Sequence, residues 1–112
     1  MADIVKKSFN SPDEVQNPGE KLKVEVVTAD GLKLQKITAE PGWQWSKYLK
    51  PVVGGDSCQK DHLIYIISGK GHVRMDNGKE EDFGPGDVIA IPPGHDGWNA
   101  GSEPIVWLEI PH

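Results

Sequence analysis

Short apolar stretches separated by turn residues dominate the chain from Lys23 onward. Glycine-containing dipeptides that favour turns recur every 6 to 12 residues, and the stretches between them are rich in β-branched and aromatic residues. No window of 11 or more residues has helical periodicity free of Gly or Pro. The pattern therefore predicts an all-β sandwich or barrel. The expected strands are 23–28, 32–39, 43–49, 62–68, 72–76, 79–83, 88–91 and 105–110.

The dipeptide Asn77-Gly78 gives the sharpest local prediction. Asn-Gly favours the type I′ turn, whose twist matches that of a two-residue β-hairpin. It is therefore expected to join strand 72–76 to strand 79–83.

Strand 62–68 is apolar on both of its alternating faces, one carrying Ile64 and Ile66 and the other Tyr65 and Ile67. The last expected strand has the same two-sided character. A small barrel fills its interior with one face of each strand and shows water the other. Part of the outside is therefore expected to be covered, either by the N-terminal arm or by a second subunit in a homodimer.

Length and composition set the domain organisation. A chain of 112 residues is large enough for one modest core. Residues 1–22 mix charged residues, Pro and Gly with few apolar ones, which predicts an N-terminal arm, and residues 23–112 are expected to form the barrel domain. Together 13 Gly and 9 Pro indicate many turns and hence many short strands.

Net charge and the lack of targeting signals indicate which partners and which cellular location to expect. The net charge is −5 and the Lys and Arg residues are scattered, so binding of nucleic acid is not expected. The N-terminus lacks the apolar core of a secretory signal, and no apolar run approaches the roughly 18 residues of a membrane span. The single cysteine cannot form an internal disulfide. These features predict a soluble cytoplasmic protein without a membrane partner.

The run GPGDVIAIPPG resembles the second motif of the cupin superfamily, which has the form Gly, five residues, Pro-x-Gly, two residues, His, three residues, Asn. Gly86, Pro92 and Gly94 fall in register. The histidine and asparagine positions of the motif hold Gly97 and Gly101. The part of the motif that shapes the backbone is thus matched, and the part that supplies metal ligands is not.

The run HLIYIISG is similar to the end of the first cupin motif, with His62 at the position of the motif's glutamate and Gly69 seven residues later. The two histidines of that motif correspond to Asp56 and Cys58. The resemblance extends over residues 42–109 and implies a single antiparallel jelly-roll barrel, also called a double-stranded β-helix. It says little about a reaction.

Cys58, His62 and His95 form the candidate metal site. Cys58 and His62 share a face if their segment is extended, and His95 is expected to replace the histidine missing at Gly97. Three such ligands with an open fourth position suit a divalent transition metal, with Zn²⁺ favoured by the soft thiolate. The alternatives are that Cys58 is a small buried apolar residue and that His95 lies on the surface in a turn.

Four residues are assigned to a ligand pocket: Asp56, Trp45, Tyr65 and Trp98. An aromatic lining with few polar groups is typical of small-molecule sites. The tryptophans could equally fill the core, and Asp56 could serve the Gly54-Gly55 turn by bonding to its own backbone.

The hypothesis favoured by the sequence is a binding or sensing module that holds a metal ion, a small molecule or both inside the barrel. The alternative is a small metal-dependent enzyme that uses the bound ion as a Lewis acid on a polar or aromatic substrate. Two further hypotheses remain open. In one, Cys58 is a nucleophile activated by His62. In the other, the barrel interior is packed and free of ligand, and the outer surface serves oligomerisation or protein interaction. An acidic ligand would be held if several lysines pointed inward, although lysines usually lie in solvent; the lysines concerned are Lys36, Lys47, Lys50 and Lys60.

Overall fold

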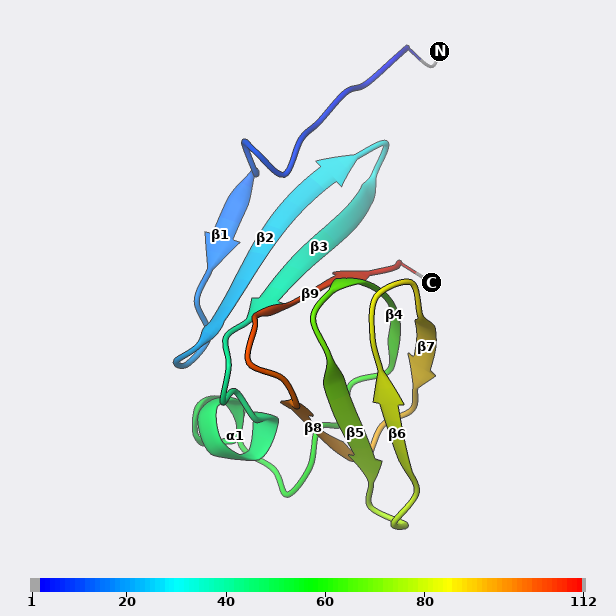
Figure 1. Ribbon diagram of the computed structural model, residues 1–112. Helices are drawn as coiled ribbons and strands as arrows, with labels where there is room; N and C mark the ends of the chain where they lie inside the picture. The colour runs from blue at the N-terminus through cyan, green and yellow to red at the C-terminus, as the bar shows by residue number, and fades with distance from the viewer. Residues whose placement is uncertain (1–2, 112) are drawn as a thin grey trace.

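The computed structural model describes residues 3–111, which form two antiparallel sheets that face each other (Figure 1). The larger sheet has the order β1-β2-β3-β9-β4-β7, and the smaller has the order β6-β5-β8. This arrangement confirms the all-β jelly-roll prediction. The elements are β1 (Glu14–Gln16), β2 (Leu22–Ala29), β3 (Leu32–Ala39), the π-helical turn η1 (Trp45–Leu49), α1 (Lys50–Val53), β4 (His62–Ser68), β5 (Gly71–Met75), β6 (Glu80–Phe83), β7 (Val88–Ile91), β8 (His95–Asn99) and β9 (Ile105–Glu109).

The strand predicted over 43–49 is wrong. A helical turn starts at Trp45 and continues into α1, where the Lys50 N–H donates to the Trp45 carbonyl. Pro51 lies in the first turn of α1, where its fixed φ suits a helix and its missing N–H costs nothing. The alternation of Trp43 and Trp45 predicted a strand, but both rings are buried through a turn instead.

Strand β8 has no counterpart among the predicted strands. Its sequence, HDGWN, contains Gly97 and little apolar character, so it lacks the usual strand signal. Pairing with β5 places His95 opposite Met75 and Gly97 opposite Val73. Tertiary pairing therefore makes a strand of a segment whose local preference is weak.

The hairpin at Asn77-Gly78 is confirmed in position, but its predicted turn type is wrong. Gly78 has a φ of +90°, whereas Asn77 is not among the described residues with positive φ. The Met75 N–H donates to the Lys79 carbonyl, which leaves a three-residue loop between β5 and β6. A three-residue loop with Gly in the left-handed conformation is the next common hairpin connection.

The core lies between the sheets, as the burial of alternate residues of β4 shows. Ile64 and Ile66 face inward and are almost fully buried, whereas Tyr65 and Ile67 on the other face are 41% and 44% exposed. The expected arm does not cover them, because β1 pairs with β2 at the opposite edge of the larger sheet. Among residues 3–111, no helix is long and apolar enough to cross a membrane.

Candidate metal and ligand site

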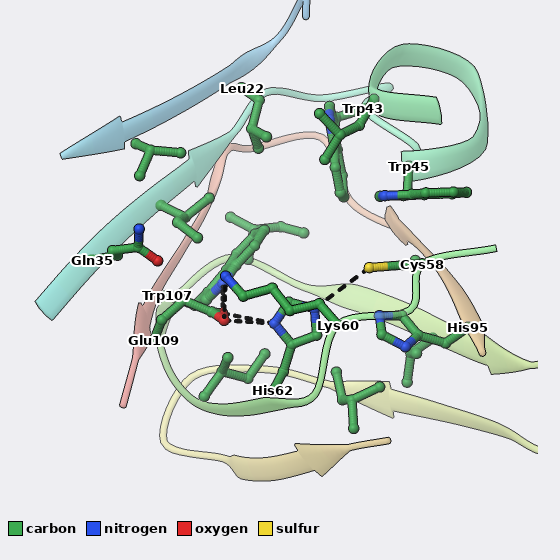
Figure 2. A pocket seen from close by; sticks show the side chains of 18 of the residues that line it. Leu22, Gln35, Trp43, Trp45, Cys58, Lys60, His62, His95, Trp107 and Glu109 are labelled. Atoms are coloured by element: carbon green, nitrogen blue, oxygen red, sulfur yellow. Dashed lines mark hydrogen bonds and ion pairs between the residues drawn. The ribbon is translucent and has the colours of Figure 1, made fainter. Parts of the chain in front are cut away.

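A pocket of about 290 Å³ opens between the sheets. Its walls are mostly apolar and aromatic, and Leu22 and Trp43 lie opposite His62 across it (Figure 2). Trp45 is only 4% exposed and also lines the pocket. Cys58, Lys60, His95 and Glu109 lie around His62, whereas Gln35 lies apart from them.

The three residues of the predicted metal site come together in the structure. Their candidate ligand atoms lie within 4.8 Å of one another. Backbone pairing positions two of them, because the Cys58 N–H donates to the His95 carbonyl at 2.7 Å. His62 enters from the start of β4, with its Nε2 atom 3.7 Å from the Cys58 Sγ atom and its ring centroid 5.1 Å from that of His95.

Both histidines are fixed through their Nδ1 atoms. The His62 Nδ1 atom lies 2.5 Å from Glu109 Oε1, and the His95 Nδ1 atom lies 2.8 Å from the Pro92 carbonyl oxygen. When Nδ1–H donates in this way, the lone pair of a neutral imidazole is on Nε2. Each ring therefore keeps its Nε2 atom available as a ligand.

Glu109 is itself held in place. The indole N–H of Trp107 donates to its Oε2 atom at 2.9 Å, and the Lys60 Nζ atom lies 3.9 Å from its Oε1 atom. Glu109 is buried at the end of β9. A buried carboxylate needs such partners, since an isolated buried charge is costly.

The thiol and the imidazole change each other's protonation. Burial alone raises the pKa of Cys58, but hydrogen bonds from His62 and His95 outweigh it and lower the pKa to about 6. Burial alone lowers the pKa of His62, but hydrogen bonds with Cys58 and Glu109 raise it to about 9. Without an ion, the pair is therefore a thiolate beside an imidazolium at neutral pH.

The separation of Cys58 and His62 suits two ligands of one metal ion. With Zn–S near 2.3 Å and Zn–N near 2.1 Å, the sulfur and nitrogen ligands of one zinc ion lie about 3.5 Å apart. The observed separation of 3.7 Å between Cys58 and His62 is close to this value. Histidine ligands usually donate their second N–H to a carboxylate or a backbone carbonyl, as both histidines do here.

The residues predicted to line the pocket divide into two groups. Trp45 and Trp98 belong to the lining, although the Trp98 ring also stacks on His72 at 4.8 Å. Asp56 is exposed and borders a separate polar hollow. Tyr65 lies on the outer face of β4 and does not line the pocket.

Glu109 is the residue that sequence reasoning missed. The alternation that places Ile105 and Trp107 on one face of the last strand also places Glu109 on that face. A carboxylate at an inward position of an apolar strand indicates a site, because a buried carboxylate almost always has a hydrogen-bond or ion-pair partner. This signal was available in the sequence.

The comparisons with known proteins identify the fold. A family model of the cupin domain matches residues 58–111. Residues 58–111 therefore match a cupin domain, and the chain has the cupin fold. No curated protein matches it by sequence.

Solved structures share this cupin fold. A polyketide cyclase from Streptomyces resistomycificus has 17% identity and a TM-score of 0.67, over 96% of this chain and 78% of that protein. An oxalate decarboxylase from Lactobacillus farciminis has 20% identity and a TM-score of 0.60 over 86% of this chain. The Bacillus subtilis oxalate decarboxylase, a protein with Mn(II) centres, has 26% identity and a TM-score of 0.55 over 84% of this chain. This chain spans only 30% and 27% of the two decarboxylases.

The structure shows how His95 compensates for the glycine at the histidine position of the second motif, Gly97. Gly97 lines the pocket, and a Cβ atom there would meet its nearest neighbour at an ordinary 3.6 Å. His95 precedes it by two residues and therefore points to the same side of β8. The imidazole of His95 therefore lines the pocket, as a side chain at position 97 would.

Proposed function

We propose that this protein binds a divalent transition metal through Cys58, His62 and His95, and that the adjoining pocket holds a small molecule. The observation that carries the proposal is the convergence of one thiol and two imidazoles within 4.8 Å at the wall of an apolar pocket. The hydrogen bonds from both Nδ1 atoms support it, since they leave Nε2 free for an ion.

Zinc is the ion we favour. A thiolate is a soft ligand, and a set of one sulfur and two nitrogens suits Zn²⁺ better than a hard ion. The Mn(II) centres belong to a larger relative. The proposed site needs Cys58 as a free thiol, which a reducing cytoplasm maintains, so we propose a cytoplasmic location.

Element analysis tests the metal site directly. Protein purified without a metal column is expected to hold about one equivalent of metal, and Cys58→Ser and His62→Ala are expected to lose it. His72→Ala is the matched control, because His72 lies on the outside of the smaller sheet, bonded to Glu80 and Asp82. Absence of metal from the wild type, or its retention in His62→Ala, would contradict the proposal.

The pocket supports binding of a small molecule. The indole N–H of Trp43, which lines the pocket, is buried and has no acceptor among the described residues. An unpaired buried donor costs about 1–3 kcal/mol, which a bound acceptor removes. A sensing role, in which ligand binding is reported to a partner, is a variant of this binding function.

Metal-dependent catalysis is the second candidate. Three protein ligands with one open position next to a pocket are typical of catalytic zinc sites, where the ion polarises a substrate or lowers the pKa of bound water. Substrate turnover by metal-loaded protein, lost in Cys58→Ser, would favour the enzyme. Ligand binding without turnover would favour the binding module.

A metal-free nucleophile is a further alternative, and one contact favours it. Glu109 orients His62, which faces Cys58, so the structure contains the third group that a thiolate–imidazole pair requires. Element analysis distinguishes the metal site from the metal-free nucleophile, since the nucleophile requires no bound ion.

We also propose a homodimer. Tyr65 pairs with Val88 across β4 and β7, and their outward side chains are 41% and 64% exposed. The arm carries Ile4 and Val5, which are 93% and 57% exposed and are followed by two lysines. The arm of a second copy would complement this apolar patch and the acidic strand β6 that precedes β7.

Light scattering at micromolar concentration tests the dimer. The wild type is expected to have twice the mass of one chain, and Val88→Lys or Ile4→Lys to shift it toward the monomer. A monomeric wild type would refute the dimer without affecting the metal site.

A further inference from the structure

Lys60 is a charged side chain at the boundary between the pocket and solvent. Among the described lining residues it is the only Lys or Arg, and its side chain is 57% exposed. Figure 2 shows it extending past His62 toward Glu109. The other lysines considered from the sequence, Lys36, Lys47 and Lys50, do not line the pocket.

The charges around the proposed ion do not cancel. Lys60 and Glu109 offset each other, and His62 and His95 are neutral when they bind a metal through Nε2. A divalent ion with one Cys58 thiolate then leaves a single positive charge. No other charged side chain lines the pocket among the described residues.

An unbalanced charge beside an apolar pocket favours a ligand of opposite charge. Burying an unpaired ion is costly, and a counterion removes that cost. A second negative charge on the ligand would find no partner in the lining, which is otherwise apolar or neutral. The walls opposite His62, which include Leu22 and Trp43, suit a hydrophobic body.

We propose that the pocket selects small hydrophobic monoanions, such as aryl or alkyl carboxylates, and that Lys60 is a specificity-determining residue for the negative charge. This inference rests on the proposed function, because the charge balance includes a bound divalent ion. The carboxylate lies at the cationic end beside Lys60, and the hydrophobic body packs among the tryptophans.

The test measures binding to protein loaded with zinc, after the zinc content has been determined. The tryptophans of the lining provide a fluorescence signal. Phenylacetate is expected to bind at least about tenfold more tightly than phenylacetamide, which lacks the charge, since a charged hydrogen-bonded group contributes about 1.5–3 kcal/mol. Acetate, which lacks the hydrophobic body, and phenylmalonate, which carries a second charge, are also expected to bind more weakly than phenylacetate.

Lys60→Met isolates the contribution of the ammonium. Because Lys60 is half exposed, we expect a loss of about two- to fivefold in affinity for phenylacetate and no change for phenylacetamide. Lys36→Met is the matched control, since Lys36 pairs with Leu108 on the outer face of the larger sheet. Unchanged binding of phenylacetate by Lys60→Met would remove Lys60 from the proposal.

The failure of this inference is distinguishable from the failure of the proposed function. Protein that takes up no stoichiometric zinc refutes both. Zinc bound in the expected ratio, with equal affinities for phenylacetate and phenylacetamide, refutes the selectivity alone and leaves the metal site standing.

Discussion

Two histidines with carboxylate partners lie in different surroundings in this protein. His62 lies in the pocket, with Nδ1 on Glu109 and Nε2 facing Cys58. His72 lies on the outer side of the smaller sheet, where both of its ring nitrogens are bonded to carboxylates. The pKa of each is raised, but hydrogen bonds to exposed carboxylates suffice for His72, whereas the rise at His62 opposes the effect of burial.

The difference shows what distinguishes a candidate ligand from a surface ion pair. A carboxylate partner alone is not enough, because His72 has two and no ring nitrogen left for another ligand. His62 has one nitrogen fixed and the other directed at a thiol beside an apolar cavity. Substitutions that change these features test the comparison between His62 and His72.

The largest effect is expected when His62 loses the charge of its carboxylate partner. Glu109→Gln is expected to weaken metal binding by about 10- to 100-fold, because the partner that orients a histidine ligand also raises its basicity. Asp82→Asn, which changes a partner of His72, is expected to leave metal affinity unchanged. Competition with a chelator measures both, and equal effects of the two substitutions would contradict the comparison.

The next effect concerns the thiol. In metal-free protein, alkylation of Cys58 is expected to follow a pKa of about 6, so the rate reaches its plateau by pH 7–8. His62→Ala removes a hydrogen bond that lowers this pKa and should move the profile toward the ordinary value of 9.0, whereas His72→Ala should not. The rate of reaction with iodoacetamide as a function of pH gives the answer. A wild-type profile centred near pH 9 would show that the two side chains do not form an ion pair.

The smallest effect is expected for the stability contribution of His72. Its folded-state pKa lies above the ordinary 6.5, so its contribution is complete below pH 6.5 and is lost as the pH rises through the folded value. Because Asp82 is 84% exposed, solvent limits the contribution to less than about 1 kcal/mol. Urea unfolding of metal-free His72→Ala should therefore show a small loss at pH 5 and none at high pH. A larger loss at high pH would have the wrong sign for this ion pair.

The fold was predictable because its signals are local and repeated. Turn residues marked β3, β4 and β7 at their observed bounds, and alternation placed Ile64 and Ile66 inside. The segment from Trp45 and strand β8 were missed, since the first has strand-like alternation and the second has weak strand preference. Both segments take their conformation from contacts with distant parts of the chain.

The candidate site was predictable only in part. The spacing of Cys58 and His62, and the empty position at Gly97 two residues after His95, pointed to the three residues that the structure brings together. Glu109 belongs to the site through β9, which lies beside β4 in the sheet although it is far away in sequence. The alternation of the last strand indicates that Glu109 faces inward, but its pairing with His62 follows only from the fold, because a single sequence does not encode strand order directly.

The backbone bridge between Cys58 and His95 has a consequence for unfolding. These two residues are distant in sequence and are brought together by folding, so a metal ion held between their side chains would bind the folded state in preference to the unfolded chain. Metal supply would then set the resistance of the domain to unfolding, by about 2.7 kcal/mol when the free metal concentration is 100 times its dissociation constant. The lifetime of the protein in a cell would thereby depend on the metal content of its surroundings.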